Sequence, residues 1–414
     1  MQLSRLDTWL EQIRHQHRIE IDLNLERVKS VARTLGLLNP TCKIVIVGGT
    51  NGKGSTVAGL EAIYLASGYR VGAFTSPYLY RFNEVVCIQG SACEDEDFIH
   101  AFQRIEEARG QITLTQFEFN TLAALDIFQK KQIDVGILEV GLGGRLDAVN
   151  IINADVAIVT SIAIDHADRL GDTREKIGFE KAGIFRSGKP AICGDFDPPV
   201  SLLTHAKDHS VPLFCQNEQF GFEKQDSSWV WWSEKQRLEN LPLSRLAMQN
   251  MSSVLMAIEL MQPILPVDRN AIDAGLKKVD LPGRIQVTPG DVTHIADVSH
   301  NPAAALFLAD YLKQHSTLGK TRAVFSMLAD KDIIATLHVM RDSIDEWYIA
   351  PLSCDRGSSL AVLEYCFRTV KIDQIHSYPT IKEAYHSAMS ASKTGDRIVV
   401  FGSFHTVAEA SKDV

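Results

Sequence analysis

The distribution of apolar and polar positions predicts a chain in which strands and helices alternate. An apolar run over residues 43–47 is typical of a buried strand, and apolar side chains recur at helical spacing over residues 56–67. Residues 71–77, 135–148 and 155–166 continue the pattern with strands that end in glycines or polar residues. Such alternation is typical of βαβ units, so we expect an α/β domain with a mostly parallel sheet that is buried on both faces.

A different pattern follows between residues 210 and 245, where large aromatic side chains stand among polar ones. This composition predicts a small antiparallel ribbon, and the amphipathic aromatics are expected to pack it onto the main sheet. The aromatic residues concerned are Phe214, Phe220, Phe222, Trp229, Trp231 and Trp232.

A proline- and glycine-rich stretch at residues 281–291 indicates a domain boundary. We therefore divide the chain into residues 1–286 and 287–414. The second part restarts the α/β pattern, with a strand, a turn and a helix that has Pro302 in its first turn, and it predicts a smaller Rossmann-like domain. Three further strands are predicted at residues 323–333, 346–353 and 397–407.

Composition narrows the class of protein. With 414 residues, 45 % apolar and 22 % charged, the chain is long enough for two or three globular domains. A net charge of −9 without a long basic run argues against binding to nucleic acid. No apolar stretch approaches the ~20 residues that span a membrane, and the polar start is unlike a signal peptide. Seven scattered cysteines without a C-x-x-C pair argue against disulfides and zinc. We expect a reduced, cytoplasmic monomer.

The strongest chemical motif is GGTNGKGST at residues 48–56, which lies between the first strand and the first helix of the pattern. Glycines let backbone N–H groups turn inward, and a helix N-terminus favours phosphate. Lys53 would reach the terminal phosphates, and the Ser55 and Thr56 hydroxyls could touch phosphate or Mg²⁺. The spacing departs from the common phosphate loop because Gly54 follows the lysine. The alternative is a glycine-rich turn without a ligand.

Polar side chains also follow three other predicted strands: Ser76, Glu139, and the pair Asp165 and His166. Ligands of open parallel sheets bind outside the carboxyl ends of the strands. Hydroxyl, carboxylate and imidazole groups there could complete a Mg²⁺ shell with phosphate oxygens, although histidine is an unusual Mg²⁺ ligand. Alternatively, Glu139 caps a helix and His166 is a core histidine.

Lys181 stands beside Glu180 in the otherwise apolar segment FEKAGIF. A lysine withdrawn from water has a lowered pKa and can react as a neutral amine. The alternative is an ordinary ion pair on the surface.

In the second half, Arg284, Asp297 and His300 gather around the boundary and the next strand end. An aspartate at a strand end can bind ribose hydroxyls, and an arginine can pair with phosphate. Helix capping is the alternative explanation for residues 300–302.

Together these motifs resemble those of the folylpolyglutamate synthase family within the Mur ligase superfamily, most closely its bifunctional members. The ordered set is GTNGKGS, LEVGLGGRLDA, SIAIDH, EKAGIFR, LPGR and DVSHNP, and the resemblance covers nearly the whole chain. It implies a P-loop, Mur ligase-type central domain followed by a smaller C-terminal domain. The implied activity is ATP-dependent amide ligation of L-glutamate to 7,8-dihydropteroate and to reduced folates, through an acyl phosphate.

The resemblance also implies roles for individual residues. ATP contacts fall on Thr50, Asn51, Gly52, Lys53, Gly54, Ser55, Asn250, Arg284 and Asp297. Magnesium ligands fall on Ser76, Glu139 and His166, with two metal sites, and Lys181 matches a lysine that CO₂ carbamylates. The pterin-binding segments correspond to His15, Gln16, His17, Arg18, Thr115, Gln116, Phe117, Glu118, Leu146, Asp147 and Ala148. Phe117 would stack on the pterin, Asp147 would accept its N–H groups, and His300 would orient or deprotonate the amine.

Two other functions remain open at this point. One is a Mur-type ligase that adds an amino acid to a UDP-linked sugar acid. Such enzymes generally carry an additional N-terminal domain, for which the roughly 40 residues before the phosphate loop are too few. The other is a non-enzymatic P-loop switch, which would leave Arg284, Asp297 and His300 without a role.

Overall fold

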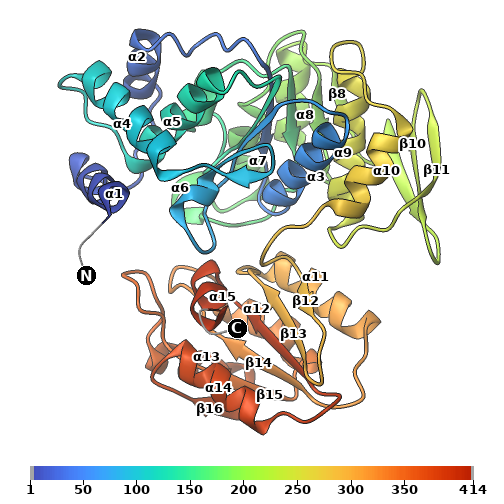
Figure 1. The fold of residues 1–414 in the computed structure, drawn as a ribbon. Coiled ribbons are helices and arrows are strands. Elements are labelled where there is room, and N and C mark those ends of the chain that lie inside the picture. The colour runs from blue at the N-terminus through green and yellow to red at the C-terminus, as the bar shows by residue number, and fades with distance from the viewer. Residues whose placement is uncertain (1–3, 412–414) are drawn as a thin grey trace. The chain divides into compact units, whose positions relative to one another are not determined.

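The computed structural model describes residues 4–411 and divides into two compact units, Met1–Asp280 and Leu281–Val414, here called unit 1 and unit 2. Each unit is an α/β domain (Figure 1). The division lies before the turn at residues 281–284, not after residue 286 as the sequence suggested. The turn belongs to unit 2 because Val298 N–H donates to Gly283 O (2.9 Å) and Ile285 N–H donates to the Asp297 carboxylate (2.9 Å).

Unit 1 is built on an eight-stranded sheet with the order β4-β3-β2-β5-β1-β6-β7-β8. The strands from β2 to β8 in this order are parallel, whereas β3 and β4 are antiparallel additions that the sequence pattern did not predict. The strands are β1 (Lys43–Gly48), β2 (Val71–Phe74), β3 (Val86–Ile88), β4 (Ser91–Ala92), β5 (Val135–Glu139), β6 (Val156–Val159), β7 (Ala191–Cys193) and β8 (Leu213–Cys215).

Helices cover both faces of this sheet. They are α1 (Arg5–Gln16), α2 (Glu26–Thr34), α3 (Lys53–Ala66), α4 (Asp95–Arg109), α5 (Gln116–Lys130), α6 (Ala167–Leu170), α7 (Arg174–Ala182), α8 (Val200–Asp208), α9 (Met248–Met261) and α10 (Arg269–Lys278), with short 3-10 turns η1 (Phe82–Val85) and η2 (Ala148–Ile151). On one face α3 packs on β1, β2 and β5, and α9 packs on β6 and β7; on the other, α5 packs on β2.

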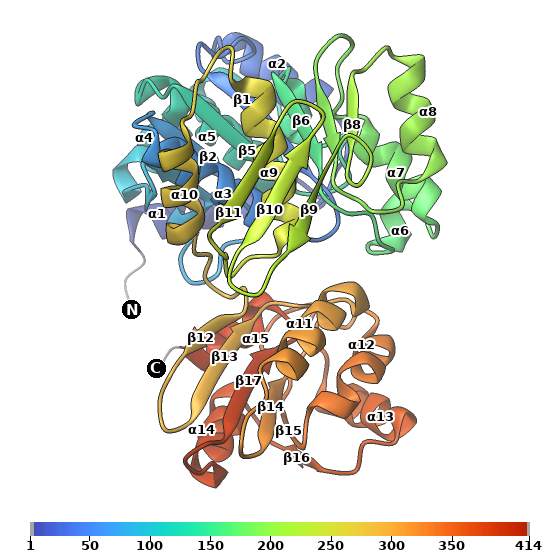
Figure 2. The same ribbon diagram turned by 90° about the vertical axis from the view of Figure 1, so that its right-hand side faces the viewer.

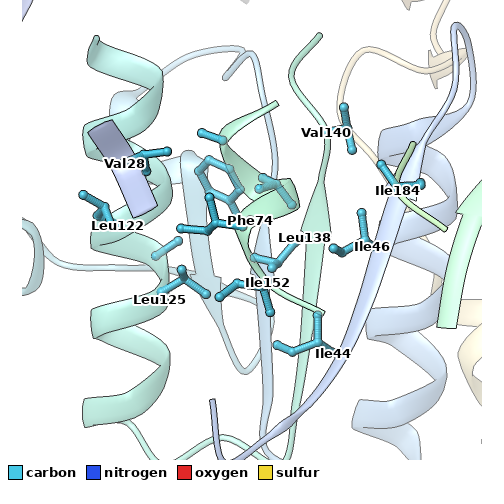
Figure 3. Close-up of a cluster of buried hydrophobic side chains, with 14 of the residues drawn as sticks. Val28, Ile44, Ile46, Phe74, Leu122, Leu125, Leu138, Val140, Ile152 and Ile184 are labelled. Atoms are coloured by element: carbon cyan, nitrogen blue, oxygen red, sulfur yellow. The ribbon is translucent and has the colours of Figure 1, made fainter. Parts of the chain in front are cut away.

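Side-chain alternation along β1 explains this two-faced burial. Ile44 and Ile46 belong to the core beneath α5, whereas the equally buried Val45 and Val47 point to the opposite face. Figure 3 shows the α5 side, where aliphatic side chains from the helix and from β1, β2 and β5 point toward one another. The residues labelled there are Val28, Ile44, Ile46, Phe74, Leu122, Leu125, Leu138, Val140, Ile152 and Ile184.

The predicted antiparallel ribbon is a three-stranded sheet of β9 (Phe220–Lys224), β10 (Trp229–Ser233) and β11 (Arg237–Leu241). It packs on α9, not directly on the main sheet, as Figure 2 shows. Trp231 is fully buried and its indole N–H donates to Ser252 O on α9 (3.1 Å). Phe214 lies in β8 of the main sheet and is no part of the ribbon.

Unit 2 is a six-stranded sheet with the order β12-β13-β17-β14-β15-β16, in which only β12 is antiparallel. Its elements are β12 (Gln286–Thr288), β13 (Thr293–Asp297), α11 (Pro302–Gln314), β14 (Thr321–Phe325), α12 (Ile333–Met340), η3 (Arg341–Ser343), β15 (Glu346–Ile349), α13 (Leu360–Val370), β16 (Ile375–Ser377), α14 (Ile381–Ala391), β17 (Arg397–Phe401) and α15 (Phe404–Ala410). The strand predicted at 397–407 ends at Phe401, because Gly402 adopts φ +114° and Ser403 caps α15.

All seven cysteines are free thiols, as their spacing predicted. In the described part of the chain no helix is long and apolar enough to cross a bilayer.

Candidate active site

The phosphate loop joins β1 to α3 through two glycines in backbone conformations that other residues rarely adopt. Gly49 has φ +142° and Gly52, the N-cap of α3, has φ +90°. A Cβ atom on Gly49 would lie 1.9 Å from Thr160 Oγ1. The loop therefore requires glycine at position 49 both for its conformation and for its close approach to the end of β6.

The segment after β6 holds this loop in place. Thr50 N–H donates to Ser161 O (2.7 Å), Asn51 N–H donates to Ser161 Oγ (3.1 Å), and Thr160 Oγ1 donates to Asn51 O (2.7 Å). Lys53 Nζ donates to the carbonyl oxygens of Gly49 (3.2 Å) and Thr50 (3.3 Å). An ammonium group thus lies within the turn of the loop, at the N-terminus of a helix, which is an arrangement that suits an anionic phosphate.

Two predicted loop contacts, Ser55 and Thr56, are both buried, with 5 % and 0 % of their surface exposed. Ser55 and Thr56 are both in the first turn of α3, but Thr56 is completely buried and its hydroxyl has no hydrogen-bond partner among the described residues. Thr56 is therefore a poor candidate for phosphate or magnesium. Asn250, predicted as a nucleotide contact, lies against the loop: a Cβ atom on Gly52 would be 2.4 Å from Asn250 Oδ1.

The structure brings Ser76 and Glu139 together at adjacent strand ends. Ser76 N–H donates to Glu139 Oε2 (3.2 Å), and Glu139 is only 5 % exposed. His166 follows β6 with a left-handed backbone (φ +50°), which is uncommon for a residue with a side chain and is found at functional sites. Its N–H donates to Asp165 Oδ1 (2.9 Å). His166 is half-buried, so it is not a core histidine.

The donor chemistry at these strand ends fits magnesium in part. Among residues 4–411 no three His, Cys, Asp or Glu side chains come together as a metal site. Any metal would therefore need the hydroxyl of Ser76 and phosphate oxygens besides Glu139 and His166. Oxygen-rich, partly ligand-supplied coordination is what Mg²⁺ prefers.

Lys181, near the end of α7, is 3 % exposed and has neither an ion pair nor a hydrogen bond within the described residues. Burial and, next, the like charge of Lys53 lower the pKa of Lys181 from 10.5 to about 7, against the opposing charges of Asp165 and Asp147. The surface ion pair considered from the sequence is wrong, because Glu180 pairs with Arg145 (2.8 Å).

Asp147 is buried and holds its own loop. Its carboxylate accepts the backbone N–H groups of Leu142 (2.8 Å) and Val149 (3.0 Å). Burial raises the pKa of Asp147 from 3.8 to about 6, although these N–H groups act in the opposite direction. The carboxylate thus has a structural role in the loop at residues 141–149, in addition to any substrate contact.

Phe117, predicted to stack on a pterin, is half-buried in the first turn of α5. A Cβ atom on Gly141 would lie 2.6 Å from its ring, and the ring centroid is 5.7 Å from that of Phe74. Phe117 therefore faces the loop that carries Leu146, Asp147 and Ala148. The structure brings these two predicted segments together.

Glu118 lies in the same turn but faces inward. Its carboxylate accepts the Thr115 N–H (2.7 Å) and an Arg27 N–H (3.2 Å). Burial raises the pKa of Glu118, while these two partners lower it. Glu118 is a helix cap, and the T-x-x-E spacing from Thr115 is the sequence signal that predicts it.

The N-terminal segment is only partly placed as predicted. His15 pairs with Glu11 on the surface, Gln16 bonds to Glu106, and Arg18 is exposed. His17 lies close to the second predicted segment: its Nδ1 is 2.9 Å from Thr113 Oγ1, two residues before Thr115.

Two residues that sequence reasoning missed complete this connection. Asp22 lies 3.1 Å from His17 Nε2 and 2.6 Å from Arg27 Nη1, and Arg27 continues to Glu118. No local signal reveals the connection, since Arg27 and Glu118 are 91 residues apart.

In unit 2, Arg284 and His300 meet at Phe404, a residue that the sequence did not single out. The Arg284 guanidinium lies 5.1 Å from the centre of the Phe404 ring, and the His300 ring centroid lies 6.4 Å from it. Buried Asp297 accepts the N–H groups of Ile285 (2.9 Å) and Ser299 (2.9 Å).

The start of α11 explains two members of the predicted 300–302 group, since Asn301 is its N-cap and Pro302 its first residue. Asn301 caps α11 by accepting the Ala304 N–H (2.9 Å). His300 instead lies with Nδ1 3.0 Å from Val298 O.

Comparison with known proteins gives two family matches: the Mur ligase middle domain over residues 47–240 and the Mur ligase glutamate ligase domain over residues 283–404. The chain is also similar to the dihydrofolate synthase/folylpolyglutamate synthase of Escherichia coli K12. That relative is 43 % identical over 98 % of this chain and 94 % of its own length. The Haemophilus influenzae protein of the same name is 40 % identical over 98 % and 97 %.

Solved structures agree with this assignment. The E. coli protein in complex with DHPP and ADP superimposes with a TM-score of 0.94 at 43 % identity, covering 98 % of this chain and 96 % of that one. A Yersinia pestis bifunctional folylpolyglutamate synthase/dihydrofolate synthase complexed with AMPPNP and Mn gives 0.93 at 45 % identity, covering 98 % and 97 %.

Proposed function

The chain belongs to the dihydrofolate synthase/folylpolyglutamate synthase family of ATP-dependent ligases, and from that premise we propose that it joins L-glutamate both to 7,8-dihydropteroate and to reduced folates. The products would be dihydrofolate and folylpolyglutamates. One observation carries the proposal most directly: a glycine-built phosphate loop with Lys53 lies in the same unit as Lys181, whose pKa is lowered by burial and, next, by the charge of Lys53.

The proposed reaction begins by activating the acceptor carboxylate. A carboxylate does not react with an amine, because oxide is too poor a leaving group. A carboxylate oxygen therefore attacks the γ-phosphorus of ATP, the bond to the β–γ bridging oxygen breaks, and ADP leaves. Such transfers depend on positioning and charge neutralisation, which Lys53 and the N-terminus of α3 would provide.

Ligation follows when the amino nitrogen of L-glutamate attacks the carbonyl carbon of this acyl phosphate. Phosphate leaves with one of the former carboxylate oxygens, and the nitrogen loses a proton. His300 would orient the amine or accept that proton, and Arg284, Asp297 and Asn250 would contact the nucleotide. Mg²⁺ held by Ser76, Glu139 and His166 would supply positive charge to the phosphates.

Lys181 supports a second magnesium site in this proposal. With a pKa of about 7, much of its amine is neutral near neutral pH, and a neutral amine adds to CO₂. The nitrogen forms a bond to the carbon, one N–H proton goes to water, and a carbamate with two oxygens results. A carbamate would turn a buried amine into an oxygen ligand suited to Mg²⁺.

The acceptor would be recognised by the face between Phe117 and the loop that carries Leu146, Asp147 and Ala148. Phe117 is half-buried, and its ring could stack on a flat heterocycle. The contact between Phe117 and Gly141 supports this choice of face, since it brings the two segments together.

The test is glutamate-dependent ADP release with three acceptors: dihydropteroate, a reduced folate monoglutamate, and a UDP-linked sugar acid. We expect release with the first two, in a 1:1 ratio to the ligated product, and none with the third. ADP release that needs no acceptor and no glutamate would contradict the proposal and favour a nucleotide switch. Release only with the UDP-linked acid would favour a peptidoglycan-type ligase.

A further inference from the structure

The backbone of Ile162 is held at both its N–H and its carbonyl oxygen, which belong to two consecutive peptide units, by one ion pair. Its N–H donates to Asp195 Oδ2 (2.6 Å), and its carbonyl oxygen accepts from Arg174 Nε (2.9 Å). Arg174 Nη2 also donates to Asp195 Oδ1 (2.9 Å). Asp195 follows β7 and is 7 % exposed, whereas Arg174 is the first residue of α7. The segment after β6, the segment after β7 and the start of α7 are thus connected at the backbone of Ile162.

The residues on either side of Ile162 support the phosphate loop. Ser161 accepts the N–H groups of Thr50 and Asn51 through its carbonyl and its hydroxyl. Ala163 bonds with the Thr50 hydroxyl through both its N–H (3.1 Å) and its carbonyl (3.1 Å). The backbone that the ion pair holds is therefore the same backbone on which Thr50 and Asn51 rest.

The same segment continues directly to His166, the predicted magnesium ligand. Between Ile162 and His166 lie only Ala163, Ile164 and Asp165. A left-handed residue such as His166 keeps its conformation only where its surroundings fix it. Fixing Ile162 shortens the free backbone on the N-terminal side of His166 to a few bonds.

A second ion pair of Arg174 provides an internal comparison. Arg174 Nη1 pairs with Asp197 Oδ2 (2.8 Å), but the Asp197 side chain is 89 % exposed and does not contact Ile162. Exposed ion pairs contribute little to stability. Removing Asp195 or Asp197 therefore distinguishes the effect of holding Ile162 from the effect of an ion pair to Arg174 alone.

We propose that Arg174 and Asp195 are positioning residues of the ligase: by holding the N–H and the carbonyl oxygen of Ile162, they fix the segment 161–166 and with it the phosphate-loop support and His166. This inference rests on the proposed function for the roles of the loop and of His166. The rigidity of the segment 161–166, on which the inference depends, can be measured without ligands.

The experiment compares Asp195→Asn with Asp197→Asn in the full chain. An amide at position 195 has only one acceptor oxygen, and its NH₂ group would oppose either the Ile162 N–H or Arg174. Deuterium uptake by the peptide that contains residues 161–166 is measured without nucleotide or metal. Mn²⁺ affinity in the presence of AMPPNP and the KM values for ATP and glutamate are measured as well.

We expect Asp195→Asn to accelerate deuterium uptake in this peptide and to weaken Mn²⁺ binding and kcat/KM for ATP by about 10- to 100-fold. The KM for glutamate and all readouts of Asp197→Asn should stay within about twofold of the wild type. If Asp195→Asn is poorly folded, Arg174→Lys replaces it, because a lysine can pair with Asp195 but cannot also reach the Ile162 carbonyl.

Two results would overturn the inference. One is a lowered unfolding temperature in Asp195→Asn or Arg174→Lys with unchanged Mn²⁺ affinity and kinetics per folded enzyme, which would leave the ion pair a structural role only. The other is equal effects of Asp195→Asn and Asp197→Asn. If the wild type proves inactive as a ligase while Asp195→Asn still takes up deuterium faster than the wild type in residues 161–166, only the proposed function is refuted. The role of the ion pair in fixing the segment would stand.

Discussion

Two buried cations, Lys181 in unit 1 and Arg322 in unit 2, have opposite surroundings. In unit 2, Arg322 is 5 % exposed and is paired with Glu346 (2.8 Å) and with Asp396. In unit 1, Lys181 is 3 % exposed and has no acidic partner in the described part of the chain. The two side chains are equally withdrawn from water, so the difference lies in their neighbours.

The pKa shifts follow from those neighbours. Burial alone would raise the pKa of Asp396, but the Lys393 and Lys320 N–H groups and Arg322 lower it to about 2, so that this pair stays charged. Lys181 instead has its pKa lowered to about 7 by burial and by Lys53. A paired buried charge ties strands together, whereas an unpaired one leaves a reactive amine; perturbed groups of the second kind mark functional sites.

The largest expected effect concerns Lys53, the cation of the phosphate loop. Lys53→Ala removes the ammonium from the phosphate loop and should lower glutamate-dependent ADP release by about 10²- to 10³-fold. Thermal unfolding should change little, because Lys53 Nζ bonds only to carbonyls of its own loop. Lys189→Ala, which removes a half-exposed partner of Asp155, is the matched control and should retain turnover. Wild-type turnover of Lys53→Ala would remove the loop from the mechanism.

Replacing each buried cation by methionine tests the comparison itself. Lys181→Met should reduce ligation by about 100-fold while the unfolding temperature stays the same or rises, because an apolar side chain replaces an unpaired buried amine. Arg322→Met should cost about 3–5 kcal/mol of stability, because it removes the cationic partner of the buried Asp396 carboxylate, whereas half-buried Glu346 keeps Lys320. Assays and thermal unfolding of both variants decide the matter; a large loss of stability in Lys181→Met would show that the two cations are alike.

Two glycines of unit 1 with positive φ allow a comparison. Glycine at one position is needed for function, and at the other only for the backbone conformation. Gly49→Ala forces a Cβ atom against Thr160 and should lower kcat/KM for ATP by up to about 100-fold through displacement of the loop. Gly68→Ala, at φ +82° in open space after α3, should cost about 1 kcal/mol in stability and leave kcat/KM unchanged. Equal kinetic effects of the two variants would argue against a precise phosphate loop.

The last prediction concerns the pH dependence of stability. Lys181 has a pKa of about 7 in the folded protein and 10.5 ordinarily, so between these values the unfolded chain binds more protons and wild-type stability gains with rising pH. The stability advantage of Lys181→Met should therefore be greatest below pH 7 and vanish toward pH 10.5. Denaturant unfolding at several pH values measures it, and an advantage that is constant with pH would mean that Lys181 is not perturbed.

Much of the fold follows from local pattern, as the alternating burial of β1 and the glycines of the phosphate loop illustrate. Predictions from local sequence pattern were wrong or incomplete where the structure depends on backbone conformation or on residues far away in the chain. The run 397–407 looked like one strand, but Gly402 turns it into α15. The roles of Arg27, Phe404 and Asp195 depend on partners far away in the chain, so no spacing could reveal them. Burial likewise distinguished Lys181 from a surface lysine.

The most direct test of the account is to follow the carboxylate oxygens of the acceptor. Dihydropteroate labelled with ¹⁸O in its carboxylate is ligated to glutamate with ATP, and the released phosphate is analysed by mass spectrometry. If ATP activates the acid as an acyl phosphate, one ¹⁸O atom enters each phosphate for every dihydrofolate formed. Unlabelled phosphate beside full product formation would contradict carboxylate activation by this site.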